Sequence, residues 1–215
     1  GWTFNTGWNG AVGTECSWFG VTCDMTSSHV TAILFPNNNL TGTLPNLDAL
    51  TALQEFDVGQ SGICFSAFQN SIGGALPDLS ALTALSYFVA GCNLFTGTVP
   101  SLAGLTALTY FRVNNNQLTG TIPSLAGLNN LVRFDVDSNQ LVGTIPSLSD
   151  LTNLAYFDAS SNQLIGAIPS LGGMTNLYEF YANGNRLNGT IPLLDGLTNL
   201  HQFAVDNNQL TGTIP

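Results

Sequence analysis

Residues 116–123 read NQLTGTIP, and close copies of this octapeptide recur along the chain. They read NNLTGTLP at 38–45, NQLVGTIP at 139–146, NRLNGTIP at 185–192 and NQLTGTIP at 208–215. From Pro77 to Pro215, the prolines that close the motif follow one another every 23 residues. A fixed period in the twenties is the signature of a solenoid, in which each unit buries its apolar face against its neighbours.

The whole repeating unit reads L-x-x-F-x-V-x-x-N-x-L-x-G-x-I-P, and eight copies align between residues 30 and 215. The alternating F-x-V step predicts a short strand with its apolar residues facing inward. An asparagine follows each strand, and we expect its amide to satisfy backbone groups left in the interior by the bend. This column contains Asn38, Asn93, Asn116, Asn139, Asn162, Asn185 and Asn208.

The octapeptide itself divides into inward and outward positions. In the fourth copy, Leu118 and Ile122 should point into the core, and Thr119 and Thr121 should point out. We expect Gly120 to allow close backbone approach at the inward face. An insertion of nine residues, at about 62–70, interrupts the period between the second and third copies.

These motifs resemble the leucine-rich-repeat family, whose consensus strand is L-x-x-L-x-L-x-x-N-x-L. The L-x-G-x-I-P continuation resembles the plant-type extracellular subclass, and the 23-residue unit resembles its bacterial and protist relatives. The resemblance implies an α/β-type repeat solenoid, a horseshoe with a parallel concave sheet, a short second sheet and a convex side of 3-10 turns and loops. It implies an N-terminal cap at 1–29 and eight repeats at 30–215.

The cap expectation comes from CSWFGVTC at 16–23, preceded by Trp2 and Trp8. A solenoid exposes its first core layer unless a cap covers it, and these tryptophans with Trp18 and Phe19 are large enough to do so. The family resemblance implies a Cys16–Cys23 disulfide. Cys64 lies in the insertion and Cys92 in the next copy, so we expect a second disulfide between them, although four cysteines allow three pairings.

Composition excludes several classes of function. The 215 residues include no lysine, three basic residues and 13 acidic ones, for a formal net charge of -10. Nucleic-acid binding and adhesion to anionic membranes both need a basic surface, so neither is expected. No run of about 18 apolar residues could span a bilayer. Two disulfides would place the protein in an oxidising, extracellular compartment, secreted or at the cell surface.

The outward residues of the strands form what we call the strand face, made of the third, fifth and seventh positions of each unit. Most of the tyrosines and many of the acids fall in these columns. Tyrosine is favoured at recognition surfaces because it offers a large, rigid, amphipathic contact, although exposed strands also favour such residues. The predicted ligand-binding residues are Glu55, Asp57, Tyr87, Tyr110, Arg112, Arg133, Asp135, Asp137, Tyr156, Asp158, Glu179, Tyr181 and Asp206.

Two uses of Arg112 and Arg133 remain open. Related plant receptors use paired arginines on this face to take the terminal carboxylate of a peptide, and a guanidinium fork suits that group. Asp135 is the expected cross-strand neighbour of Arg112, with Asp158 one strand further. We therefore favour an internal salt-bridge patch, because opposite charges across a strand pair stabilise a sheet.

The residues on either side of the motif's glycine form a second surface, the threonine face. Strand spacing would set each column at about 4.7–4.9 Å intervals, which resembles the surface of ice-binding proteins. The alternative is that threonine is simply a good strand former. Asn39 and Asn188 lie in N-glycosylation sequons, and glycans there would prevent a flat ice surface from contacting the threonine face. The threonines are Thr41, Thr43, Thr96, Thr98, Thr119, Thr121, Thr144, Thr190, Thr211 and Thr213.

Catalysis is poorly supported, and we expect no enzyme, no metal and no cofactor. His29 and His201 are many repeats apart, and no nucleophile has a partnered base. Asp135 and Asp158 on an open sheet should lack the burial that separates carboxylate pKa values. The DVDSN stretch at 135–139 lacks the glycine and distal acid of a calcium loop.

The chain ends at Pro215 without a polar closing cap. Solenoids need such caps, so we expect either a longer natural protein or association through this end. The sequence as a whole predicts a non-catalytic module that binds a protein, peptide or glycan through the strand face. The alternatives are ice binding through the threonine face and a structural or adhesion module of a larger surface protein.

Overall fold

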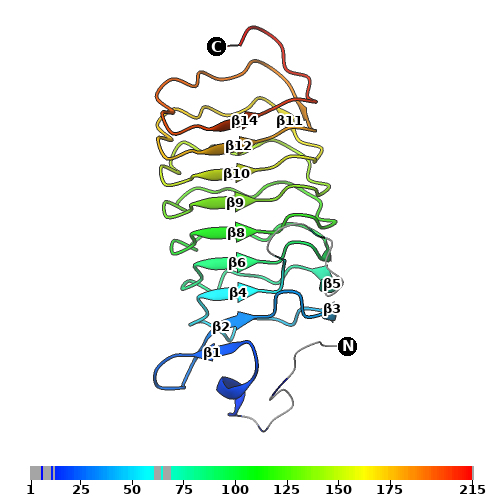
Figure 1. Cartoon of the computed structure of the whole chain (residues 1–215), viewed down its shortest axis with the longest axis vertical. Helices are drawn as coiled ribbons and strands as arrows, with labels where there is room; N and C mark the ends of the chain where they lie inside the picture. The colour runs from blue at the N-terminus through cyan, green and yellow to red at the C-terminus, as the bar shows by residue number, and fades with distance from the viewer. Residues whose placement is uncertain (1–5, 7–10, 12, 61–63, 65–68, 215) are drawn as a thin grey trace.

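The computed structural model describes residues 6, 11, 13–60, 64 and 69–214. Its strands stack one above another along the long axis, with the N-terminal end and the C-terminal end at opposite ends of the stack (Figure 1). The chain is therefore a solenoid in which each coil contributes one strand to a continuous main sheet. Among the described residues, no helix is long and apolar enough to cross a membrane.

The main sheet has nine strands in the order β1-β2-β4-β6-β8-β9-β10-β12-β14. β1 runs antiparallel to β2, and the remaining neighbours are all parallel. Equivalent repeat positions pair directly, as Phe111 pairs with Phe134. The bounds are β1 Val21–Cys23, β2 Val30–Leu34, β4 Glu55–Asp57, β6 Tyr87–Val89, β8 Tyr110–Arg112, β9 Arg133–Asp135, β10 Tyr156–Asp158, β12 Glu179–Tyr181 and β14 Gln202–Ala204.

The core behind this sheet is a column of phenylalanines. Consecutive rings from Phe56 to Phe203 stack with centroid separations from 5.1 to 5.8 Å. Stacked rings at this spacing add favourable contacts to the area that they bury. The predicted short strands with inward-facing apolar residues are confirmed, since Phe111 and Val113 are completely buried.

The asparagine column also does what the sequence predicts. Asn139 Oδ1 accepts the Leu118 N–H at 2.9 Å, and Asn139 Nδ2 donates to the carbonyls of Val113 and Val136. One amide thus satisfies backbone groups of its own coil and of the preceding one. In the second copy this role belongs to Asn70, at the end of the insertion, which donates to Phe35 O and Val58 O. The prediction omitted Asn70, although the motif NSIGGALP that follows the insertion points to it.

A second set of strands lies beyond the bend that follows the main strands, at one side of the stack (Figure 1). β3 Thr41–Thr43, β5 Ser71–Ala75 and β7 Leu94–Thr96 form one sheet, and β11 Ile165–Gly166 pairs with β13 Arg186–Leu187. Single bridges join Thr98 to Thr119 and Thr121 to Val142. The predicted short second sheet is confirmed. Its register differs from that of the main sheet, because paired residues are 21 positions apart where no insertion intervenes.

This offset corrects the predicted role of the motif's glycine. Gly120 has φ +76°, and a Cβ there would lie 2.8 Å from the Thr98 methyl carbon of the preceding coil. The clash is therefore lateral, with an exposed threonine, rather than with the core. Glycine is required both for the left-handed backbone and for this close passage beside Thr98.

The loops opposite the main sheet are made of single hydrogen-bonded turns. One such bond runs from the Leu105 N–H to Leu102 O, and the equivalent bond joins Leu128 to Leu125. Within the described residues, these loops contain no 3-10 helix, and the 3-10 helix that is present, η1 Glu15–Ser17, belongs to the N-terminal region. The loops thus have 3-10-type turns without forming helices.

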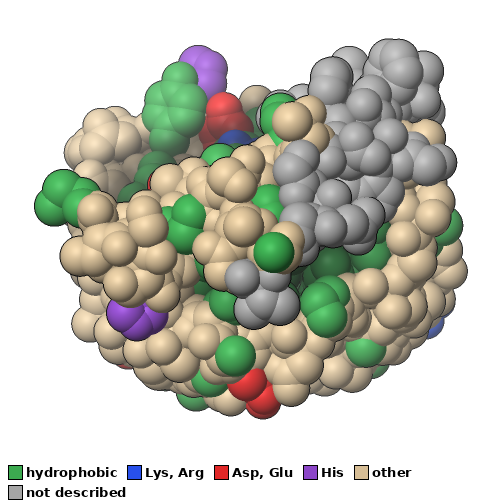
Figure 2. All heavy atoms as spheres, turned by 90° about the horizontal axis from the view of Figure 1, so that it is seen from below, with side chains coloured by type: hydrophobic (Ala, Val, Ile, Leu, Met, Phe, Trp, Pro, Cys, Tyr) green, Lys and Arg blue, Asp and Glu red, His purple; other side chains and the backbone are tan. Residues whose placement is uncertain are grey.

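At the N-terminal end, the Cys16–Cys23 disulfide links η1 to β1, and a Cys64–Cys92 disulfide is also present, so both expected pairings are confirmed. Trp18 is half-buried, whereas Phe19 is 43% exposed with its ring 6.5 Å from that of Phe35. Figure 2 views this end, where apolar side chains remain visible among polar atoms. Trp2 and Trp8, also expected in the cap, lie outside the described residues.

We predict that Asn139→Ala lowers the free energy of unfolding by about 2–4 kcal/mol, because it leaves buried N–H and carbonyl groups without partners. Chemical denaturation of the purified chain measures the change. Gln140→Ala is the control: this neighbouring side chain is exposed, and its loss should cost no more than about 0.5 kcal/mol. Equal effects of the two substitutions would contradict the bridging role of the amide.

Candidate functional site

The strand face contains a continuous row of aromatic and cationic side chains in the third position of successive units. Tyr87 and Tyr110 stack with their centroids 4.7 Å apart. The Arg133 guanidinium follows, 5.6 Å from the Tyr110 centroid and 3.5 Å from that of Tyr156. Tyr156 in turn lies 5.7 Å from Tyr181, which belongs to the fifth position. The sheet therefore presents a preformed row of rings in which one guanidinium makes cation–π contacts with the two tyrosines beside it.

This row exists because the strands pair in exact register. Tyr87, Tyr110, Arg133 and Tyr156 occupy equivalent positions of four neighbouring strands, β6, β8, β9 and β10. Side chains at directly paired positions lie within contact distance of one another. The row is half-buried, so that part of each ring remains available to a ligand.

Beside the row, both arginines bind the same carboxylate. Asp135 Oδ2 lies 3.2 Å from Arg112 Nε and 3.1 Å from Arg133 Nη2. The favoured expectation of an internal salt-bridge patch is therefore confirmed. With both guanidinium groups engaged in this way, the structure does not present them as an open fork for the terminal carboxylate of a peptide.

The burial of two carboxylates corrects another expectation. Asp135 is 1% exposed and Asp158 is 9% exposed, although both were expected to lie open on the sheet. Asp135 is covered by Arg112 and Arg133, with which it forms ion pairs. Asp158 accepts a hydrogen bond at Oδ2 from the Tyr156 hydroxyl, at 3.0 Å. These two acids consequently shape the face from beneath and have little surface with which to touch a ligand.

Burial also changes their ionisation. It raises the pKa of Asp135 to about 7, with a further contribution from the adjacent Asp137 carboxylate. Burial likewise raises the pKa values of Asp158 and Asp57, partly offset by hydrogen bonds from Ser160 and from the Gly59 N–H, respectively. The face thus contains acids that ionise less readily than exposed ones.

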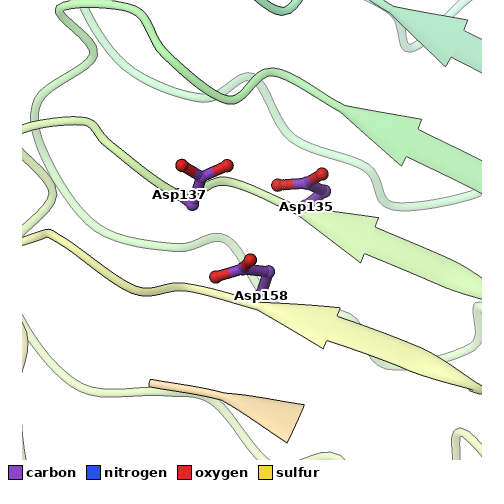
Figure 3. Close-up of side chains that lie close together, drawn as sticks. All are labelled: Asp135, Asp137 and Asp158. Carbon is purple, nitrogen blue, oxygen red and sulfur yellow. The ribbon is translucent and has the colours of Figure 1, made fainter. Parts of the chain in front are cut away.

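The structure also brings together three acids that the sequence did not connect. Asp135, Asp137 and Asp158 each offer a carboxylate oxygen, and these oxygens lie within 4.8 Å of one another (Figure 3). Asp135 and Asp158 end the paired strands β9 and β10, and Asp137 follows two residues after Asp135. The signal was present in the sequence as an acid at the fifth position of adjacent copies and at the seventh position of one of them.

The other predicted strand-face residues are spread along the solenoid. Glu55 and Asp206 are exposed, near opposite ends of the sheet, and Glu179 is half-buried. The Tyr181 hydroxyl donates to Gln202 Oε1 at 2.8 Å. These residues share one side of the sheet with the aromatic row, but the structure does not gather them into one pocket.

The threonine face has a different geometry from the expected one. All ten threonines are exposed. However, Thr98 lies beside Thr119, and Thr121 beside Val142, so that equivalent positions are two residues out of register. Two residues of strand correspond to about 6.6 Å, so the expected 4.7–4.9 Å spacing within a column is wrong. The same offset places Arg186 beside Ile165, which introduces a charge at the face.

Comparisons with known proteins agree with this architecture. A family model described as Leucine Rich Repeat matches residues 107–128. The ectodomain of the Arabidopsis receptor kinase HAESA, solved with the peptide hormone IDA and the co-receptor SERK1, is 31% identical with a TM-score of 0.74. The match covers 96% of this chain and 34% of that one.

The chain is a leucine-rich-repeat protein. Its N-terminal disulfide fits the expected cysteine cap, and the structures that it resembles include plant receptor kinases. The plant peptide hormone receptor RGFR1, solved in complex with RGF2, is 38% identical with a TM-score of 0.70, over 83% of this chain and 28% of that receptor. This leucine-rich-repeat chain therefore spans about a third of the length of the receptor structures that it matches.

A plant ice-binding protein shares the fold, with a TM-score of 0.54 over 93% of this chain and 79% of that one. Its sequence identity of 24% supports a shared fold and nothing further. No curated protein matches the chain.

We predict that the free energy of unfolding falls by about 1–2 kcal/mol between pH 5.5 and pH 7.5 in the presence of a chelator. Asp135 has an ordinary pKa of 3.8 when unfolded and about 7 when folded. The folded chain therefore binds more protons in this window, and stability decreases as the pH rises. Urea denaturation at several pH values measures the slope.

Asp137→Asn is the informative variant for this slope. It removes a carboxylate that raises the pKa of Asp135, so the fall in stability should become smaller. The exposed acids with lowered pKa values, Glu15, Asp24 and Asp78, are already ionised in both states above pH 5.5 and leave the slope unchanged. A wild-type stability that is flat or rises across the window would contradict the prediction.

Proposed function

We propose that this chain is a non-catalytic extracellular recognition module that binds a protein or peptide ligand through the strand face. The observation that carries the proposal is the row formed by Tyr87, Tyr110, Arg133 and Tyr156. Aromatic and arginine side chains are enriched among the residues that dominate binding energy at protein interfaces. A row held in place by paired strands loses little conformational entropy when a ligand binds.

The relatives support the same class of ligand. HAESA was solved with a peptide hormone and RGFR1 with RGF2, and both resemble this chain over most of its length. Because the chain covers about a third of those structures, the transfer of peptide binding to it is part of the proposal. Two disulfides fit an extracellular location, since such bonds persist in oxidising compartments.

The chemistry of the ligand follows from the charges that remain available. Arg112 and Arg133 are both paired with Asp135, whereas Glu55 and Asp206 are exposed and Glu179 is half-buried. The strand face is therefore acidic around an aromatic row. A basic peptide complements it in charge, and a hydroxyl-rich glycan is the other ligand that such a surface favours.

We predict that peptides selected from a display library on the intact chain are rich in Arg and Lys and lose affinity roughly tenfold or more on Tyr110→Ala. The substitution removes the ring that stacks on Tyr87. Tyr178→Ala is the matched control, because Tyr178 is an exposed tyrosine outside the three strand-face columns. Titration calorimetry with the selected peptides measures both affinities.

The contrary outcomes are specific. Equal affinity of wild type and Tyr110→Ala would exclude the aromatic row as the binding surface. Failure to select any peptide, together with binding of a glycan array, would replace the peptide by a carbohydrate. If neither a peptide is selected nor a glycan on the array is bound, a structural or adhesion role would be favoured.

Ice binding by the threonine face is a second candidate function. It is favoured by the exposure of all ten threonines, and the two-residue offset and the position of Arg186 count against it. Ice binding requires that the outward threonines meet a flat crystal surface together.

If ice is the ligand, a charged side chain in the middle of the face should abolish binding. We therefore predict that any inhibition of ice recrystallisation by the wild-type chain is lost on Thr121→Lys. Ala126→Lys, at an exposed position outside the two columns, should retain the wild-type effect. Absence of inhibition by the wild type, or its persistence in Thr121→Lys, would exclude this function.

A further inference from the structure

We propose that Asp135, Asp137 and Asp158 form a binding site for a divalent cation of the calcium class. The geometry comes first. The three carboxylate oxygens lie within 4.8 Å of one another, a separation that two oxygens can have when both lie about 2.3–2.6 Å from one Ca²⁺. Figure 3 shows the three carboxylates grouped where β9 and β10 end.

A buried oxygen gives an independent reason to expect a ligand here. Within the described part of the chain, Asp135 Oδ1 is buried and has no hydrogen-bond partner, whereas Oδ2 binds both arginines. The Asp137 carboxylate lies within hydrogen-bond reach of the Asp135 side chain, and when both carboxylates are ionised no hydrogen lies between them. A cation between them would satisfy both, and would remove the cost of a buried acceptor without a donor.

The local charge balance leads to the same conclusion. The two guanidinium groups of Arg112 and Arg133 contact Asp135, which is grouped with Asp137 and Asp158, and Asp57 lies close enough to Arg112 to interact with it. When all these acids are ionised, they outnumber the arginines by two charges. One divalent cation brings this cluster to neutrality.

Calcium suits the donors better than magnesium does. Asp158 already accepts hydrogen bonds from Ser160 at Oδ1 and from Tyr156 at Oδ2, so its oxygens cannot move freely into an ideal octahedron. Ca²⁺ tolerates irregular coordination by six to eight oxygens, whereas Mg²⁺ requires near-ideal octahedral geometry. Asp137 is half-buried and provides the side from which the ion and its remaining water ligands would enter.

Sequence alone argued against a metal here, because the stretch 135–139 lacks the features of a contiguous calcium loop. The proposed site is instead assembled from two adjacent coils. It does not depend on the peptide-binding proposal, because it concerns the cation alone and is tested without any other ligand.

The test titrates the whole chain, freed of metals by a chelator, with CaCl₂ and, separately, with Tb³⁺ as a luminescent calcium surrogate. We expect saturable binding at one site and a rise in the melting temperature with Ca²⁺. We also expect Tb³⁺ emission sensitised by Tyr156, whose hydroxyl is hydrogen-bonded to Asp158. A dissociation constant on the order of 10⁻⁴–10⁻³ M is expected by analogy with extracellular calcium modules. Asp137→Asn should weaken binding at least tenfold.

Asp195→Asn is the charge-matched control, because it also removes one acid, in this case an exposed one. It should retain wild-type affinity, which distinguishes the loss of a specific cation ligand from a general effect of the lower net charge. Circular dichroism verifies that Asp137→Asn is folded, and Asp158→Asn provides a second variant. The proposal is overturned if binding does not saturate by ~10 mM Ca²⁺, above the range of such modules. It is also overturned if Asp137→Asn and Asp195→Asn bind equally, or if Mg²⁺ binds more tightly than Ca²⁺.

Discussion

The interaction on which this solenoid depends is the hydrogen bonding of one inward-facing asparagine side chain per coil, buried or half-buried. Each amide accepts an N–H and donates to carbonyls in its own coil and the preceding one, as Asn139 does with Leu118, Val113 and Val136. Backbone groups at a bend cannot reach a partner strand, and an unsatisfied buried polar group is costly. The asparagine removes that cost, and it holds successive coils at one separation. The stacked phenylalanines and the paired strands both require that separation.

The strand face and the threonine face follow from this constraint in two different ways. On the main sheet, exact register converts a repeat position into a straight row, so that Tyr110 and Arg133 meet and Arg112 meets Asp135. On the threonine face the chain passes its neighbour two residues out of step, and Thr98 meets Thr119 instead of Thr121. The same period therefore produces a row on one face and an oblique arrangement on the other.

Much of this architecture could be predicted from the sequence, because the period fixes which residues are equivalent. The buried phenylalanines, the asparagine amides and the Arg112–Asp135 contact follow from equivalence alone. The Cys16–Cys23 disulfide was implied by the family resemblance of the cap, and the Cys64–Cys92 disulfide by the adjacency of two copies. Features that depend on how adjacent coils are displaced could not be obtained in this way. The lateral clash at Gly120, the burial of Asp158 and the grouping of Asp137 with Asp158 all require the displacement and the side-chain directions.

The nine-residue insertion shows where this fold tolerates change. Across it, Thr41 still pairs with Ser71 and Glu55 with Tyr87, and the offset between the two sheets is the same as elsewhere once the added residues are discounted. The extra segment therefore leaves the lattice of the coils undisturbed, and the Cys64–Cys92 bond fastens it to the next coil. The arc between a main strand and the second sheet is thus a natural graft position. New loops can be added there, one coil at a time, next to a strand face that keeps its geometry.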